Sequence, residues 1–474
     1  MKPLQKIGLL IPVLTMAGCV SLAPDYQRPD SPVMAEWRDT QAAQQNSSAV
    51  ATNKVMAAIK WQDYFQDPKL RQVINLALTN NRDLRIALLN IEQARAKYGI
   101  QEATLWPSIS VSSSKTASRT PASVNGGDSA TISHQYEAGI GFSSYELDLF
   151  GRISSLKDEA LESYLSTVET QRSTRLSLIA EVANNWLTLA TNLQLQALAR
   201  QTLNSQLETL KLTQKMYNQG IASKLNLAQV QSSVETARVD VATYKAQVAQ
   251  DRNALELVVG TQLKDNLLPT VKLEKTIALA PIPANLKSSV LLQRPDVLAA
   301  EHSLQGANAN IGAARAAFFP TISLTASAGR SSNQLNDLFS SSNRNWSFTP
   351  SISLPIFNAG SLSASLKESK VRRDIAVAEY EKTIQIAFKE VADVLSVRAS
   401  LDERLKAQKA LVKANSQSYT LSNARYRNGL DSYLDALDSQ RQLYSAQQAL
   451  IQLQLTEYSN RVTLFKVLGG GTEA

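Results

Sequence analysis

The chain has 474 residues and a formal net charge of +8 at pH 7, and its 18 glycines and 6% aromatic content are low for a large globular enzyme. The many alanine, leucine, glutamine and serine residues favour long helices instead. No dense basic run suited to nucleic acid accompanies the charge, so we expect no nucleic-acid partner. His134 and His302 stand far apart in the sequence and predict no metal site.

The N-terminus has the pattern of a bacterial lipoprotein signal peptide. Two lysines precede a short apolar run, and Ala17-Gly18-Cys19 follows it. We expect residues 1–18 to be removed and Cys19, the only cysteine, to carry a lipid as the first residue of the mature chain. Val20 stands in place of the Asp that retains lipoproteins in the inner membrane, which favours the outer membrane. The alternative is an ordinary signal peptide with an incidental cysteine.

Residues 19–66 are predicted to form an N-terminal extended and equatorial segment, because their first part is rich in proline and a later part is polar. A helix start follows, with Asp67 as N-cap and Pro68 in the first helical position. We expect this helix to continue towards Trp106.

Two segments alternate apolar and hydroxylic side chains, as amphipathic strands do. Within 321–328, Ile, Leu and Ala alternate with Thr and Ser, so one face is apolar and the other hydroxylic. A similar strand follows after a Ser/Asn-rich loop, which predicts a β-hairpin over 320–357. The earlier segment 107–149 predicts a second β-hairpin, because it starts with Pro-Ser-Ile where the later one has Pro-Thr-Ile.

Glycine and proline positions divide the chain into two copies. Neither residue occurs in the 68 positions between Gly151 and Gly220, nor in the 68 positions between Gly360 and Gly429, and 39 more such positions follow each tract. Tracts of this kind, with apolar spacing of three and four, are typical of long helices in a coiled assembly. The chain is therefore interpreted as a tandem duplication.

Each copy is predicted to contain a helix, a β-hairpin, a very long helix, a tight turn and a shorter helix. The turns are expected at Gly220 and Gly429. The predicted boundaries are the first copy at 67–260, an equatorial linker of mixed short elements at 261–288, the second copy at 289–469 and a tail at 470–474.

A hairpin with one lipid-facing side needs a closed barrel, because lipid cannot satisfy open strand edges. Four strands per chain are fewer than the ~8 of the smallest membrane barrels, so several chains must share one barrel, and three chains would give twelve strands. Helices continuous with these strands would extend the barrel as a tube into the periplasm. A membrane pore joined to a long tube is a conduit.

Five motifs of the mature chain carry a resemblance to a known family. They are Ala-Pro-Asp-Tyr-Gln-Arg-Pro near the N-terminus, Arg-Pro-Asp-Val at 294–297, the paired Trp-Pro-Ser-Ile and Phe-Pro-Thr-Ile strand starts, Leu-Pro-Ile-Phe-Asn-Ala-Gly at 354–360, and Ala-Arg-Tyr-Arg-Asn-Gly-Leu-Asp-Ser-Tyr-Leu-Asp at 424–435. In combination they resemble the TolC-type outer membrane factor family, in its OprM-like or NodT lipoprotein branch. The resemblance implies an α+β membrane protein: a trimeric 12-stranded outer-membrane β-barrel, four strands per chain, continued by a long α-helical coiled periplasmic tunnel with a mixed equatorial belt.

The same resemblance implies the passive exit duct of a tripartite efflux pump in a Gram-negative outer membrane. The implied partners are two further copies of the chain in a homotrimer, a periplasmic adaptor (membrane fusion) protein, an inner-membrane pump of the RND type and outer-membrane lipid. Drugs or other small toxic solutes are the expected cargo, and no cofactor is expected beyond the lipid anchor on Cys19. The sequence has no Walker-A loop, nucleophile elbow, HExxH or paired Cys motif, so we expect no enzyme.

The turns at Gly220 and Gly429 join the longest helices, so we expect them at the far tip of the tube, where the duct closes and meets the adaptor. Asp435 and Asp438 follow the second turn. Three-fold symmetry would make them carboxylate rings that attract cations. The alternative is that the helix dipole favours these acids in the first turns of a helix.

Four further residues belong to this expected periplasmic gate. The resemblance places a tyrosine and a basic side chain just before the turn, which Tyr426 and Arg425 match, and Tyr217 is the equivalent of Tyr426 in the first copy. Leu434 is expected either to add a hydrophobic ring to the gate or only to pack against neighbouring side chains. Asp431 stands where some family members have a basic gate residue.

Other functions stay open at this point. A trimeric coiled-coil structural or adhesin-like lipoprotein would use the strands only as an anchor, although such a stalk has no need for lumen-facing hydroxyls. A duct for metal-ion efflux is less favoured, because a tunnel poor in Met and His offers no ligand set for soft metals. A duct for protein secretion is a further alternative.

Overall fold

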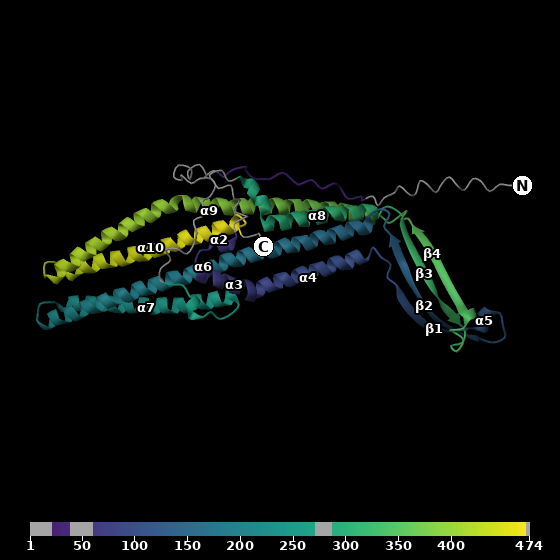
Figure 1. Cartoon of the computed structure of the whole chain (residues 1–474), viewed down its shortest axis with the longest axis horizontal. Coiled ribbons are helices and arrows are strands. Elements are labelled where there is room, and N and C mark those ends of the chain that lie inside the picture. The colour runs from purple at the N-terminus through teal and green to yellow at the C-terminus, as the bar shows by residue number, and fades with distance from the viewer. Residues whose placement is uncertain (1–20, 38–59, 271–286, 471–474) are drawn as a thin grey trace. The chain divides into compact units, whose positions relative to one another are not determined.

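The computed structural model describes residues 21–37, 60–270 and 287–470. The predicted lipid-bearing Cys19 and most of the predicted linker 261–288 lie outside these residues. The chain forms two compact units (Figure 1). Of the described residues, the first unit contains 21–30, 91–167 and 300–380, and the second contains 31–37, 60–90, 168–270, 287–299 and 381–470.

Two very long helices carry most of the chain. α6 (Arg152–Asn218) and α9 (Ser361–Arg427) have 67 residues each. A shorter helix follows each of them: α7 (Lys224–Val259) has 36 residues and α10 (Tyr433–Val467) has 35. The matched lengths agree with a tandem duplication. None of the helices in the described residues combines the length and the apolar character needed to cross a membrane.

The first long helical segment begins where the sequence predicts. A short helix, α2 (Trp61–Tyr64), precedes it, and α3 (Pro68–Asn80) starts with proline in its first turn. Asp67 caps α3, because its Oδ1 accepts hydrogen bonds from the backbone N–H groups of Lys69 and Leu70 at 2.7 and 3.0 Å. Two of the otherwise unpaired N–H groups at the helix start are thereby satisfied.

The prediction of one continuous helix towards Trp106 is wrong, because the helix breaks at Asn81. This residue has an extended backbone, and α4 (Arg82–Ala103) begins after it. The Asn81 side chain accepts a hydrogen bond from the N–H of Leu84 at 2.8 Å and donates one to the carbonyl of Val258 at 2.8 Å. A contact to α7, far along the chain, therefore supports the break.

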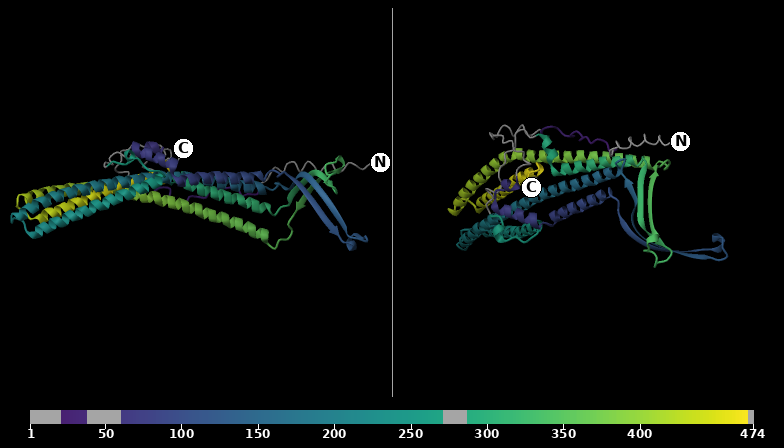
Figure 2. Two further views of the ribbon diagram at one scale, coloured as in Figure 1. Left: turned by 90° about the horizontal axis from the view of Figure 1, so that it is seen from below. Right: turned by 45° about the vertical axis from the view of Figure 1, so that its right-hand side comes forward.

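The first unit contains a four-stranded antiparallel sheet with the order β1-β2-β3-β4 (Figure 2). The strands are β1 (Ser110–Thr120), β2 (Thr131–Leu147), β3 (Thr321–Ser332) and β4 (Arg344–Ser353). They form two hairpins that pair with each other through β2 and β3. A short helix, α5 (Ala122–Asn125), lies in the loop between β1 and β2.

The register gives this sheet one apolar and one hydroxylic face. Directly paired residues share a face, and so do residues two apart on one strand. The apolar rows are Val111, Ile140, Ala328 and Trp346; then Phe142, Ala326 and Phe348; then Tyr145, Leu324 and Pro350; then Leu147, Ile322 and Ile352. A β-bulge between Phe142 and Tyr145 adds one residue to β2 and keeps both rings on this face.

The N-terminal segment of the first unit lies on α8 (Pro295–Ala316). Three residues of α8, spaced seven apart, bind it: Glu301 accepts from Arg28 at 2.7 and 2.8 Å, Asn308 donates to the carbonyl of Pro24 at 2.7 Å, and Arg315 donates to the carbonyl of Leu22 at 2.9 Å. Gly312 permits the close approach, because a Cβ there would lie 2.7 Å from the backbone nitrogen of Ala23. The segment is therefore antiparallel to α8, and Leu22 lies towards the end of α8 that leads into β3.

The second unit packs α2 against α10 through aromatic rings. The centroids of the Tyr64 and Phe465 rings are 4.4 Å apart, and Phe65 meets Phe465 edge-on at 5.7 Å. The Tyr64 hydroxyl donates to the carbonyl of Arg461 at 2.7 Å. Buried aromatic pairs with their polar atoms satisfied stabilise a core strongly.

Candidate functional site

Both predicted turns end a long helix with a glycine in the left-handed conformation. The φ angles of Gly220 and Gly429 are 74° and 72°. In the first turn Gly220 and Ile221 donate to the carbonyls of Tyr217 and Met216 at 2.9 and 2.9 Å. The second turn repeats this pattern at 2.9 and 3.0 Å, so both are Schellman motifs. Figure 1 places the two turns at the same end of the second unit.

Tyr426 lies inside the helix packing next to the second turn. Its side chain is 6% exposed, and its hydroxyl lies 3.0 Å from Oγ1 of Thr213 on α6. Its ring centroid lies 5.4 Å from that of Tyr433 on α10. Val230 of α7 belongs to the same buried cluster, so all four long helices meet around Tyr426. Tyr217, the equivalent residue of the first copy, is 38% exposed.

Arg425 and Asp431 form an ion pair across the second turn. The guanidinium donates to both carboxylate oxygens at 2.5 and 2.8 Å. This pairing raises the pKa of Arg425 and lowers the pKa of Asp431, in each case mainly through the side-chain hydrogen bond. The equivalent positions of the first copy are Met216 and Ala222, which cannot form such a pair.

The two carboxylates that follow the second turn are exposed and form only neutral hydrogen bonds. Asp435 accepts from the Ser432 hydroxyl at 2.8 Å, and Asp438 accepts from the Gln442 amide at 2.7 Å. Among the described residues neither carboxylate forms an ion pair. Leu434 is 56% exposed, so it does not pack inside its own chain. The negative charges are thus free to act on something outside the chain.

Sequence reasoning missed three residues that organise this end of the helices. Tyr433 is 3% exposed, and its hydroxyl donates to Oε1 of Gln206 at 3.3 Å. The amide of Gln206 donates in turn to Gln440 at 2.6 Å, and Thr213 bonds Tyr426. The spacing of Tyr433 with Ala436 and Leu437, three and four residues on, is the apolar signal that could have identified it.

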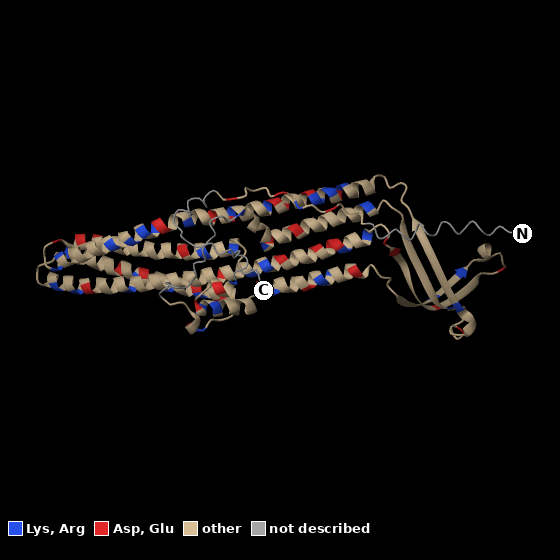
Figure 3. Cartoon of the chain, turned by 45° about the horizontal axis from the view of Figure 1, so that its top comes forward, with Lys and Arg blue, Asp and Glu red and all other residues tan. Residues whose placement is uncertain are grey.

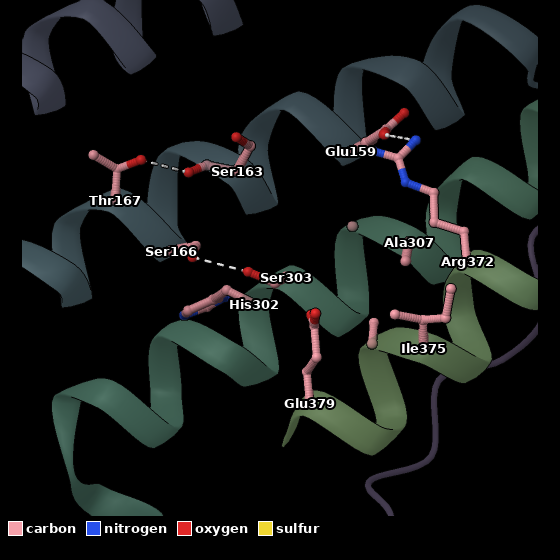
Figure 4. A pocket seen from close by; sticks show the side chains of 12 residues that line it. Glu159, Ser163, Ser166, Thr167, His302, Ser303, Ala307, Arg372, Ile375 and Glu379 are labelled. Atoms are coloured by element: carbon pink, nitrogen blue, oxygen red, sulfur yellow. Dashed lines mark hydrogen bonds and ion pairs between the residues drawn. The ribbon is translucent and has the colours of Figure 1, made fainter. Parts of the chain in front are cut away.

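A cavity of about 460 Å³ with both polar and apolar lining lies among α6, α8 and α9 of the first unit (Figure 4). His302 lies 2.7 Å from Oε2 of Glu162, and Glu159 accepts from Asn310 at 2.6 Å. Arg372 lies 3.4 Å from Glu159. These bonds join neighbouring helices, and within the described residues no group of three or more His, Cys, Asp or Glu is placed to hold a metal ion.

A sheet with one apolar and one hydroxylic face, joined to two hairpins of very long helices, defines the class of outer-membrane channel proteins. The chain belongs to the outer membrane efflux protein family, whose model matches residues 73–261 and 286–470. The two matched segments correspond to the two copies of the duplicated architecture.

Relatives that are named as outer membrane proteins match the chain over almost its full length. The probable efflux pump outer membrane protein TtgC of Pseudomonas putida is 47% identical over 98% of this chain and 95% of that protein. Outer membrane protein OprJ of Pseudomonas aeruginosa is 39% identical over 99% and 96%. The solved structure of the open-state MtrE outer membrane channel of Neisseria gonorrhoeae has 35% identity and a TM-score of 0.85, covering 96% of this chain and 99% of that one. A CusC structure has 35% identity and a TM-score of 0.86, covering 95% and 100%.

These findings confirm the principal predictions from the sequence. The chain is an outer-membrane efflux protein of the TolC type with the predicted fold class, in which each chain supplies four strands and long helices. The family consists of efflux channels and not of enzymes. The roles of the individual tip residues stay predictions.

Proposed function

We propose that three copies of the chain form the passive exit duct of a tripartite efflux pump. Their twelve strands make one barrel in the outer membrane, and their helices make the periplasmic tunnel. The observation that carries this proposal is the sorting of the sheet into an apolar face for lipid and a hydroxylic face for a water-filled lumen. The edge strands β1 and β4 of each chain need partners, which neighbouring copies supply.

The two tip turns are the proposed contact with a periplasmic adaptor protein, which connects the duct to an inner-membrane pump of the RND type. Both turns expose large apolar side chains. Ile221 and Leu225 are 67% and 66% exposed in the first copy, and Leu430, the equivalent of Ile221, is 67% exposed in the second. Exposed apolar clusters of this kind mark protein interaction sites.

Asp435, Asp438 and Leu434 form the proposed periplasmic gate. Around a three-fold axis, six unpaired carboxylates would repel one another and attract cations. Leu434 would add an apolar ring at the same constriction. Arg425 and Tyr426 contribute differently, since both already have partners within the chain and therefore shape the turn and its helices.

Drugs and other small organic toxicants are the proposed cargo. Relatives of this chain are named as pump components for toluene, solvents and antibiotics, in Pseudomonas putida. The hydroxylic sheet face offers water-like hydrogen-bonding groups, as a passive duct requires.

Cys19 is the proposed site of the lipid anchor. The described segment after it is fixed to α8 with Leu22 towards the β3 end, which supports an anchor at the membrane end of the helices. Replacing Cys19 by Ser should abolish acyl labelling while trimers still form. Unchanged labelling of that variant would refute the anchor.

Single-channel conductance of the purified protein in a planar bilayer tests the duct itself. A duct gives discrete current steps, which become larger when the adaptor is added because it opens the tip. A well-folded trimer that carries no current with or without the adaptor would contradict the proposal and favour a sealed stalk.

A further inference from the structure

The charged residues of the four strands are sorted by sign between the two faces of the sheet. Every lysine and arginine in the strands lies on the face of the apolar rows, as the register requires: Lys115, Arg119, Arg330 and Arg344. Both carboxylates of the strands, Glu137 and Glu146, lie on the hydroxylic face. If water covered both faces equally, positive and negative side chains would have no reason to lie on opposite faces. The cations on the apolar face therefore meet a different environment from the carboxylates on the hydroxylic face.

The cations are also confined to one end of the apolar face. Arg330 and Arg344 form the row directly after Ala328 and Trp346, ~7 Å further along the strands. Lys115 lies in the next row, beside Tyr136. This is the end that carries the loops, whereas the other end leads into the helices (Figure 3).

Nothing in the described residues neutralises this basic row. No carboxylate forms an ion pair with any of the four cations in the part of the chain that the structure describes. Arg330 donates to the carbonyls of Phe339 and Ser340, and the Lys115 ammonium lies 5.4 Å from the centroid of the Tyr136 ring. Arg330 and Arg344 are direct cross-strand partners, and like charges placed opposite each other destabilise a sheet.

An anion would remove this repulsion, and phosphate is the anion that fits best. The planar guanidinium matches a phosphate group with two parallel hydrogen bonds, and the lysine ammonium adds a point charge. The apolar rows continue directly from the basic row, so the matching ligand has acyl chains joined to a phosphate. The surface is thus complementary in both charge and polarity to a phosphorylated lipid.

We propose that Lys115, Arg330 and Arg344 bind the phosphate groups of glycolipid in the outer leaflet of the outer membrane. The inference rests on the proposed function, because the apolar face meets lipid only when the strands form the barrel. The loops then face the exterior, and the basic row lies where the acyl chains end and the phosphorylated headgroups begin. Trp346, in the last apolar row, lies at the interface where barrels place aromatic girdles.

The test uses native mass spectrometry of the full-length protein in detergent, titrated with diphosphorylated lipid A. The test variant is Lys115→Gln with Arg344→Gln, and Arg330 is left in place because it holds the loop. A charge-keeping variant, Lys115→Arg with Arg344→Lys, shows whether charge or shape matters. The matched control removes two exposed lysines of α9, Lys406→Gln with Lys409→Gln.

Wild type and the control should retain the lipid equally, and the test variant should bind about tenfold more weakly or worse. The charge-keeping variant should bind more tightly than the test variant, because it keeps both positive charges and one guanidinium at the exchanged positions. Dephosphorylated lipid should bind wild type as weakly as the test variant binds the phosphorylated form. Equal retention by the test variant, or binding by the charge-keeping variant as weak as that of the test variant, would overturn the proposal. Displacement of the lipid by inorganic phosphate alone would also overturn it, because it would indicate a free-anion site.

Bilayer conductance of the same preparations separates this inference from the proposed function. If wild type conducts and the test variant still retains the lipid, the lipid site is refuted and the proposed duct is not affected. A wild type that never conducts refutes the duct and, with it, the basis for this site.

Discussion

The two helical hairpins of the chain have the same backbone and different chemistry. In both, a helix of 67 residues ends in a Schellman turn at a left-handed glycine. The second hairpin adds a buried tyrosine, an ion pair across its turn and two exposed carboxylates. The first has an exposed Tyr217, and its equivalents of the charged residues are all uncharged. Duplication thus preserved what the architecture needs, and the charged residues of the proposed gate are confined to the second copy.

The largest expected difference between the copies concerns their equivalent tyrosines. Tyr426→Ala leaves a cavity among four helices and should lower the free energy of unfolding by about 3 kcal/mol. Tyr217→Ala should lower it by less than about 1 kcal/mol, because that ring is partly exposed. Denaturant unfolding in detergent measures both. Equal losses would mean that the two tips are packed alike.

The turn glycines should instead behave identically. Nothing lies within 4 Å of a Cβ built on Gly220 or Gly429, so alanine meets only the cost of a positive φ, about 1 kcal/mol at either site. Gly99→Ala is the matched control, since that helical site is also open and alanine there should stabilise by about 0.5 kcal/mol. If the same assay showed a loss of unfolding free energy for only one of the two variants, the two turns would not be energetically equivalent.

The smallest effect is expected from the ion pair across the second turn. The folded protein lowers the pKa of Asp431, so the pair contributes stability above the ordinary aspartate pKa, and this is lost as pH falls through the lowered folded value. Arg425→Met, which copies the first turn, should remove that part of the pH dependence and lower stability only slightly, because the pair is solvent-exposed. Unfolding midpoints between neutral and strongly acidic pH measure it. An unchanged acid profile in the variant would contradict this assignment.

Features that depend on local sequence were predictable. Long tracts without glycine or proline predicted α6 and α9, and Asp67-Pro68 predicted the start of α3. Alternating apolar and hydroxylic residues predicted the two faces of the sheet. In each case the signal is a restriction on the backbone or a periodic pattern of side chains, and neither depends on contacts with distant parts of the chain.

Features that depend on distant contacts were not predictable in the same way. Asn81 breaks a helix with the support of a carbonyl of α7, 177 residues along the chain. The burial of Tyr426 depends on α6, α7 and α10 meeting around it, and its sequence context resembles that of the exposed Tyr217. The pairing of Arg425 with Asp431 needs the bent path of the turn, which brings residues six apart together.

The claim that the carboxylates of the second copy form the gate is tested most directly by the block of single channels with multivalent cations added from the periplasmic side. The test variant is Asp435→Asn with Asp438→Asn, and the matched control is Asp402→Asn with Glu403→Gln, which removes two exposed acids of α9. The account predicts weaker block and lower cation selectivity in the test variant, and wild-type behaviour in the control. Undiminished block in the test variant would contradict the account, because the cation site would then lie elsewhere in the duct.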